Sequence, residues 1–296
     1  MFGTGPGALP SDAFVMGIDP VDQRRRMEES LEAILALLRY EQPVTRETDW
    51  FTMREARLQL RPFTRPHFEV AVAAMISPSG PRLAGRYGVS LLSLSMQVIE
   101  GGFAAIGNAW GVVEEQAAAA GHAPPDRASW RVLGAMHVAE TRKQAYQDCT
   151  FGLEDFSKYF GTAGFVPLGT KLDSDGDTLA FVEQYAASDN VVIGTPDDAI
   201  GYIDRLLEQS GGFGTFLFLG HDWADEEATL RSYRLIARTV IPHFKDKLAA
   251  PRRSHDWAAS KRDELFGRAG QAIMNAITSH VEEKEAKEAP ATGGGH

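Results

Sequence analysis

The segment Ile76-Ser-Pro-Ser-Gly80 places two hydroxyl side chains and a glycine between an apolar stretch and a helical one. Backbone N–H groups at the start of a helix, together with the hydroxyls of Ser77 and Ser79, can bind a phosphate group. Gly80 has no side chain, so an anion can approach the backbone closely there. The same pattern also fits an ordinary helix start with a turn, and the residues alone leave both interpretations open.

Glycines at alternate positions, Gly3, Gly5 and Gly7, form a second candidate for close approach to a ligand. A dinucleotide fingerprint needs a strand before it and a third glycine at the correct offset before a helix. Neither is present here, so that chemistry has weak support. A turn from a strand into a loop at the mouth of a barrel fits the glycines better, because close backbone approach requires glycine.

Three arginines stand together at 24–26, in a chain whose formal net charge is −10. The ordinary interpretation of this run is the solvated edge of a helix. The acidic balance argues against a nucleic-acid surface, since nothing would neutralise a phosphate backbone over a long face. We therefore expect no nucleic-acid partner.

Metal and hydrolase chemistry lack the residue spacing that they need. The eight histidines are scattered, without a metal-binding pattern, and no G-x-S-x-G motif is present. We expect no metal site. We expect His137 to be a core or rim histidine on a strand and the single Cys149 to be a small apolar residue on a helix.

Apolar strands that alternate with helices must position these residues. The apolar stretches predict strands at 68–75, 89–94, 130–140, 190–194 and 213–220, the last of them buried. Helical patterns predict helices at 81–88, 99–120, 141–160, 195–209 and 225–244, and Asp19-Pro20 predicts the start of an earlier one. This alternation indicates a parallel α/β fold, either a barrel or a doubly wound sheet. Roughly five strands are counted, where a closed (β/α)₈ barrel needs eight.

Three further segments stand apart from this alternation. Residues 43–62 predict a β-hairpin excursion, and 161–177 is a Gly-, Pro- and Asp-rich loop of the kind found beside active sites. Beyond residue 250 a helix places Phe266, Ala269, Ile273 and Ile277 on one face, where they would pack on the body or on a second subunit. We expect a main domain at 1–248, a C-terminal helix with a disordered tail at 249–296, and a homo-oligomer.

The ends and the apolar stretches of the sequence bear on its location. No basic region followed by an apolar run opens the chain, and no apolar stretch approaches ~20 residues. A single cysteine is typical of a reducing compartment. We expect a cytoplasmic protein with no membrane partner.

Four segments taken together resemble a known protein family. They are 1–34, 70–88 ("VAVAAMISPSGPRLAGRYG"), 136–145 ("MHVAETRKQA") and 194–219 ("GTPDDAIGYIDRLLEQSGGFGTFLFL"). They resemble the bacterial-luciferase-like flavin monooxygenases, and within these the limonene 1,2-monooxygenase group. The resemblance covers about 1–247.

The resemblance implies a (β/α)₈ barrel and an enzyme that uses reduced FMN, supplied by a separate NAD(P)H-dependent flavin reductase. Such an enzyme activates dioxygen and inserts one oxygen atom into a small apolar organic substrate. The implied flavin-binding residues are Ser77, Ser79 and Gly80, with Arg24 on the phosphate and Gly5 in the glycine turn. A further basic phosphate contact of the family falls at Pro6, where this chain departs from the pattern, and the resemblance assigns no catalytic residue here.

The resemblance also places the glycine turn at the end of the family's fourth strand. The sequence would then lack about three β/α units, including the family's catalytic histidine region, and we expect the natural protein to begin about a hundred residues upstream. Two alternatives remain open. One is a deazaflavin-dependent oxidoreductase of the same fold that transfers hydride without oxygen, and the other is a non-catalytic barrel fragment.

Overall fold

A computed structural model of the chain describes residues 1–39, 41–75, 77–95, 105–164, 176–188, 190–245 and 249–288. The chain divides into two compact units, 1–240 and 241–296. Ile76, most of the predicted loop at 161–177, the first residues of the helix predicted at 99–120 and the predicted tail from 289 lie outside the described residues. The predicted boundary at 248 stays a prediction.

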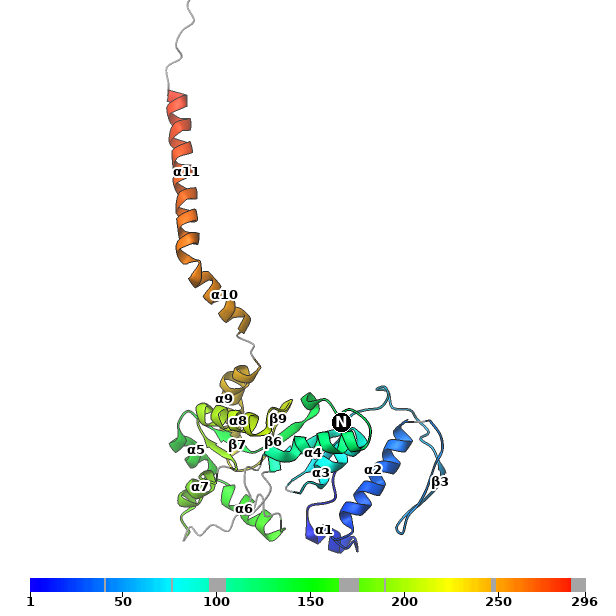
Figure 1. The fold of residues 1–296 in the computed structure, drawn as a ribbon. Coiled ribbons are helices and arrows are strands. Elements are labelled where there is room, and N and C mark those ends of the chain that lie inside the picture. The colour runs from blue at the N-terminus through cyan, green and yellow to red at the C-terminus, as the bar shows by residue number, and fades with distance from the viewer. Residues whose placement is uncertain are drawn as a thin grey trace, which may run out of the picture. The chain divides into compact units, whose positions relative to one another are not determined.

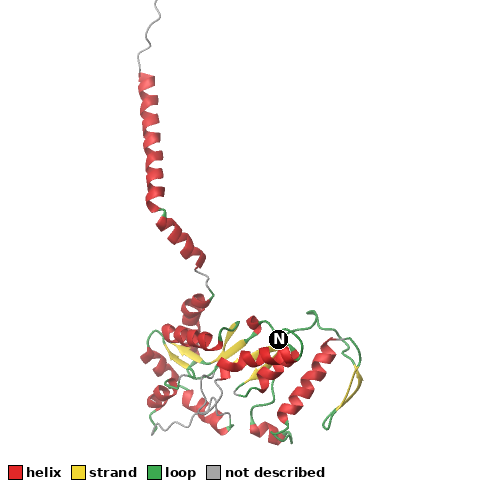
Figure 2. Ribbon diagram, in the orientation of Figure 1, coloured by secondary structure: helices red, strands yellow, loops and turns green. Residues whose placement is uncertain are grey.

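A parallel sheet forms the centre of the first unit (Figure 1, Figure 2). Its five strands, in spatial order, are β1 (Phe2–Thr4), β4 (Val70–Ala74), β5 (Ser90–Leu94), β6 (Arg131–Gly134) and β9 (Thr215–Phe218). Every neighbouring pair runs parallel. Four of the five β4 side chains are buried, as expected for a strand covered on both faces. The parallel α/β class predicted from the sequence is confirmed.

The strand predicted at 130–140 divides at Ala135, which corrects the prediction of one continuous element. Its second part, β7 (Met136–Val138), pairs in parallel with β8 (Val192–Gly194) in a separate two-stranded sheet. The Leu133 carbonyl accepts a hydrogen bond from the Ser95 amide at 2.8 Å, and the Ala135 carbonyl accepts one from the Val192 amide at 3.1 Å. These carbonyls lie two residues apart and so point to the same side. Thus β5 pairs with β6, and beyond the end of β5 the strand β8 pairs with β7 on the same side of the chain.

Helices and one hairpin surround the sheets. They are α1 (Pro10–Val15), α2 (Gln23–Arg39), the antiparallel hairpin β2 (Val44–Glu47) and β3 (Thr52–Ala56), α3 (Ser79–Tyr87), α4 (Ala105–Ala119), the 3₁₀ turn Arg127–Ser129, α5 (Arg142–Cys149), α6 (Leu153–Thr162), α7 (Thr178–Ala186), α8 (Pro196–Ser210) and α9 (Glu226–Phe244). α3 packs on β4 and α4, and α4 packs on α8. The predicted hairpin excursion is confirmed.

Local sequence signals explain most helix ends, with two corrections. Thr195 and Asp198 form a reciprocal capping box at the start of α8. The helix predicted from Asp19 begins later, at Gln23, because Asp19 instead closes a turn by accepting a hydrogen bond from the Val21 amide at 3.0 Å. The helix predicted at 141–160 is interrupted, since the Gly152 amide donates to the Trp223 carbonyl at 3.0 Å.

The strand β9 is not the buried strand that its composition predicts. Its burial pattern is mixed and Phe218 is 37% exposed. Within the described residues β9 pairs only with β6, so it is an edge strand of the five-stranded sheet.

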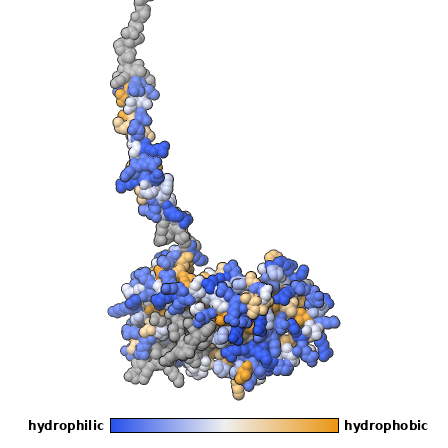
Figure 3. Space-filling model, viewed as in Figure 1, coloured by the Kyte–Doolittle hydropathy of each residue, from blue (hydrophilic) through white to orange (hydrophobic). Residues whose placement is uncertain are grey.

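The second unit contains the helices α10 (Ala249–Ser260) and α11 (Arg262–Glu288). Figure 3 shows apolar side chains scattered among polar ones along this part of the chain. The predicted apolar stripe is exposed, with Phe266 at 70% and Ile273 at 61%. No helix in the described part of the chain is long and apolar enough to cross a membrane.

Candidate functional site

The carboxyl ends of β1 and β4 lie side by side, and both predicted glycine and serine segments follow them. Thr4 pairs with Val72 in parallel register. Gly5 comes next, and a Cβ atom added there would lie 3.3 Å from the Cβ of Ala73. In barrel enzymes the active site sits at the carboxyl ends of the strands. The structure therefore brings Gly5 to the edge where a site is expected.

Gly80 lets the first turn of α3 pack directly on the end of β4. A Cβ atom added at Gly80 would lie 2.7 Å from the Ala73 carbonyl oxygen and 2.7 Å from the Cβ of Ala74. Both distances are shorter than any ordinary contact, and Gly80 itself is buried. The glycine is thus required for close packing of the helix on the strand, and its predicted contact with phosphate stays a prediction.

The two predicted serines stand together at the start of α3. Their Oγ atoms form a hydrogen bond of 2.7 Å, and both residues are half-buried. The residue that precedes α3 is Pro78, and no side chain caps the helix. The first backbone N–H groups of a helix have no partner inside it, so this end of α3 presents donors beside the two hydroxyls.

A pocket of about 390 Å³ joins these serines to α2. We call it the serine–arginine pocket, and it is lined by Arg24, Arg25, Glu28, Ser77, Pro78, Ser79, Arg82, Leu83 and Arg86. Three predicted flavin-binding residues, Arg24, Ser77 and Ser79, therefore line one cavity although about fifty positions of sequence separate them. Gly5 and Gly80 do not line it.

The four arginines of this pocket differ in what already holds them. Arg25 forms ion pairs with Asp22, Glu29 and Asp49, which raise the pKa of its guanidinium and hold the pKa of Asp49 below its usual value. Arg86 pairs with Glu28.

Arg24 and Arg82 have exposed side chains. Neither guanidinium forms an ion pair, hydrogen bond or ring contact with another described residue. Two cations that have no partner among the described residues therefore line the same pocket as the serine hydroxyls at the start of α3. This arrangement is suited to a phosphate, because guanidinium groups form charge-assisted, bidentate hydrogen bonds with its oxygens.

Arg82 was missed by the sequence reasoning. It lies three residues after Ser79 on α3, and residues three apart share one face of a helix. The three-residue spacing between Ser79 and Arg82 is the sequence feature that could have identified this arginine.

His137 and Cys149 lie in the interior, as predicted. His137 is 1% exposed, and its Nε2 lies 3.1 Å from Oδ2 of Asp148, while burial lowers its pKa. Cys149 is fully buried, and burial raises the pKa of its thiol, so it is not a reactive nucleophile. In the described part of the chain no group of three or more His, Cys, Asp or Glu side chains could hold a metal ion.

Comparison with known proteins places the chain in a family. A profile of the luciferase-like monooxygenase family matches residues 1–212, and the chain belongs to that family. The chain is 42% identical over 258 residues to limonene 1,2-monooxygenase of Rhodococcus erythropolis, covering 86% of this chain and 64% of the relative. It is 37% identical over 261 residues to 4-hydroxyprotoasukamycin monooxygenase of Streptomyces nodosus subsp. asukaensis, covering 88% of this chain and 69% of that protein.

A solved structure agrees in fold. The oxygenating component of 3,6-diketocamphane monooxygenase from Pseudomonas putida, a type II Baeyer–Villiger monooxygenase in complex with FMN, matches with a TM-score of 0.56 and 26% identity. The match covers 81% of this chain and 70% of that one. The chain therefore has the luciferase-like barrel architecture, and it spans just under two thirds of the limonene 1,2-monooxygenase that it matches.

Proposed function

We propose that the protein is an FMN-dependent monooxygenase, which uses reduced flavin and dioxygen to oxygenate a small apolar organic substrate. The observation that carries this proposal is the serine–arginine pocket, where Arg24 and Arg82, which have no partner among the described residues, line one cavity with the serines at the start of α3, at the carboxyl edge of a parallel sheet. The 42% identity to a limonene 1,2-monooxygenase supports an apolar substrate. The FMN complex of the 26% identical relative supports FMN.

The residues of the pocket fit the phosphate of FMN. Arg24 and Arg82 would donate charge-assisted hydrogen bonds to its oxygens, and Ser77 and Ser79 would donate their hydroxyl protons. Gly80 keeps the start of α3 seated on β4, which fixes where these donors point. When bound, reduced FMN supplies the electrons that activate dioxygen. The protein's contribution is to hold the phosphate and so orient the flavin ring at the strand ends.

The proposal includes features of the whole protein. A separate NAD(P)H-dependent flavin reductase would deliver the reduced FMN, as the family resemblance implies. The exposed stripe on α11 supports a homo-oligomer, and the single buried cysteine supports a cytoplasmic location.

Anaerobic titration of the full chain with reduced FMN, reduced riboflavin and a reduced deazaflavin tests this function. We expect FMN to bind more tightly than riboflavin, because only FMN has the phosphate. Arg24→Gln should weaken FMN binding by about tenfold and leave riboflavin binding unchanged. Arg54→Gln, an exposed arginine of the hairpin outside this pocket, is the matched control.

Other outcomes separate the alternatives. A preference for the deazaflavin would support the hydride-transferring oxidoreductase. Failure to bind any flavin by a chain whose circular dichroism shows an intact fold would support a non-catalytic fragment. Oxygen-dependent formation of an oxygenated product from limonene then tests the reaction itself.

A further inference from the structure

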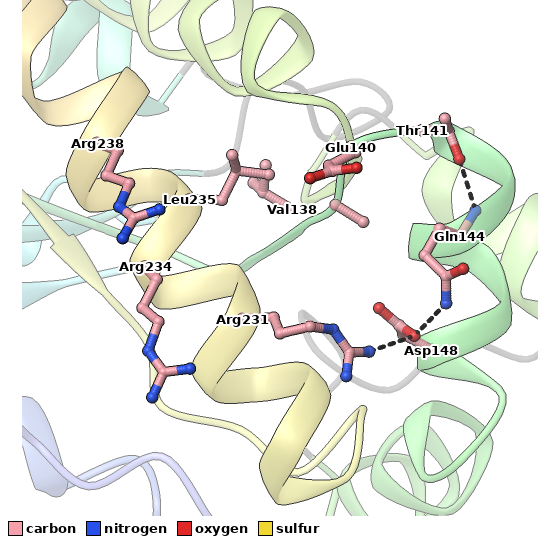
Figure 4. Close-up of a pocket in the computed structure, with 10 residues that line it drawn as sticks. Val138, Glu140, Thr141, Gln144, Asp148, Arg231, Arg234, Leu235 and Arg238 are labelled. Atoms are coloured by element: carbon pink, nitrogen blue, oxygen red, sulfur yellow. Dashed lines mark hydrogen bonds and ion pairs between the residues drawn. The ribbon is translucent and has the colours of Figure 1, made fainter.

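A second and larger cavity lies between the end of β7, the start of α5 and the helix α9. Its volume is about 580 Å³. Figure 4 shows Val138 and Glu140 on one side, with Arg231, Arg234, Leu235 and Arg238 projecting from α9. We call this cavity the α9 pocket. It shares no lining residue with the serine–arginine pocket.

One arginine of the α9 pocket is already held by protein carboxylates. Arg231 lies 3.3 Å from Oδ1 of Asp148 and 3.2 Å from Oε1 of Glu227. Asp148 also accepts a hydrogen bond from Gln144 at 2.7 Å and meets His137 at 3.1 Å. The charge of Asp148 is therefore compensated by its neighbours, and it does not neutralise the other arginines.

Arg234 and Arg238 have no such partners in the part of the chain that the structure describes. They lie four residues apart on α9, one turn of helix, and both line the cavity. Within the described ranges neither forms an ion pair, a hydrogen bond through its side chain or a ring contact. Like charges at this spacing destabilise a helix, and an anion shared between the two guanidinium groups would remove the repulsion.

The other residues that line the cavity indicate which further chemical groups the anionic ligand has. Leu235, which is half-buried, lines the cavity together with the largely buried Val138 and Ala139, so most of the apolar surface open to a ligand is that of Leu235. Glu140 is exposed and makes no ion pair among the described residues, so its carboxylate is available to accept a hydrogen bond from a ligand hydroxyl. A cavity of about 580 Å³ falls in the range of small-molecule sites, roughly 300–1,000 Å³.

We propose that the α9 pocket binds a small organic phosphate, at a site separate from the FMN phosphate. Two guanidinium groups with five N–H donors each suit a dianionic phosphate better than a carboxylate, which occupies one guanidinium fork. The apolar surface would contact the organic part of the ligand, and the Glu140 carboxylate would accept a hydrogen bond from a ligand hydroxyl. The proposal stands independently of whether the first pocket binds FMN.

Calorimetric titration of the full chain with phenyl phosphate tests the proposal. The serine–arginine pocket is first disabled with Arg24→Gln and Arg82→Gln. We expect this chain to bind phenyl phosphate, and more tightly than inorganic phosphate because the phenyl ring contacts the apolar surface. Adding Arg234→Gln and Arg238→Gln should weaken binding by at least about tenfold. The matched control replaces Arg54 and Arg268, which line neither pocket, with Gln.

A second measurement uses the unaltered chain, so that it does not depend on how the variants fold. Phenylglyoxal labels accessible guanidinium groups, and mass spectrometry locates the label. Phenyl phosphate should slow the labelling of Arg234 and Arg238 and leave that of Arg54 unchanged. Binding that survives the loss of both α9 arginines, equal loss in the control, or labelling unaffected by phenyl phosphate would overturn the proposal.

Discussion

The serine–arginine pocket and the α9 pocket each contain two arginines that have no partner in the described part of the chain, but they differ in what surrounds those arginines. In the first, the start of α3 and two serine hydroxyls stand beside the cations, and Gly80 seats that helix on β4. In the second, the cations belong to one helix and line a cavity together with apolar residues and two carboxylates. The first pocket is therefore positioned largely by the main chain, and the second by side chains.

This difference has consequences for specificity. A site built on backbone donors and a close helix contact holds a phosphate in one position. A site built from arginine side chains tolerates more variation in its ligand, because long side chains adapt their rotamers. Changes to the backbone should damage the first pocket, and changes to charge should damage the second.

The largest effect on ligand binding is expected from Gly80→Val. Its side chain would collide with the Ala73 carbonyl and Ala74, which displaces α3 and costs about 1–3 kcal/mol of folding free energy. FMN affinity should fall by about a hundredfold, since one 1.4 kcal/mol step is tenfold. Phenyl phosphate binding to the α9 pocket should stay within about twofold. Gly111→Ala, where an added Cβ meets nothing within 4 Å, is the control, and normal FMN affinity of the valine variant would contradict the packing argument.

Acid should weaken the α9 side of the molecule before the serine–arginine side. Burial lowers the pKa of His221 to about 4 and also lowers that of His137. Between pH 6.5 and 4 the unfolded chain binds protons that the folded chain excludes, so stability falls as the pH falls. His221 alone accounts for a loss on the order of 3 kcal/mol.

Urea unfolding at pH 7, 6, 5 and 4 measures this loss. His221 stacks on Trp223, with ring centroids 3.9 Å apart, so His221→Phe should retain the stacking and flatten the pH dependence. Amide exchange should rise in β7 at a higher pH than in β4. An unchanged slope in the phenylalanine variant would show that other groups cause the acid sensitivity.

A smaller effect is expected from Asp148→Asn. The change removes the charge that His137 and Arg231 share, and it should lower stability by about 1–2 kcal/mol. Arg231 then keeps only its ion pair with Glu227, so its guanidinium has more donors open to a ligand, and phenyl phosphate should bind a few times more tightly in the α9 pocket, with FMN binding unchanged. Weaker phenyl phosphate binding in a folded variant would indicate that Asp148 orients the site. Calorimetry of both ligands distinguishes the two results.

The smallest effect is expected from Arg25→Gln. Three carboxylates already occupy this guanidinium, so FMN affinity should change by less than about twofold, against about tenfold for the neighbouring Arg24→Gln. The comparison uses adjacent residues of one helix and the same chemical change. Equal losses would mean that general positive charge, rather than a free guanidinium, attracts the phosphate.

Local patterns predicted much of the body and part of the first site. The apolar run of β4 and the helical pattern of α8 are properties of neighbouring residues, so they could be read directly. The serine segment and the arginine run were identified separately. Their meeting in one pocket came from the family resemblance, because no local pattern relates Arg24 to Ser77.

The sequence by itself determined the alternation of strands and helices, the residue types that can bind phosphate, and the family. Only the tertiary structure decided which arginines stay free of carboxylates, that β8 replaces β5 beside β7, and that α9 faces the end of β7 across a cavity. The physical reason is the distance along the sequence over which each interaction acts. Periodicity and capping act within a few residues, whereas the charge on Arg234 or Arg25 is available or neutralised according to groups brought near by packing.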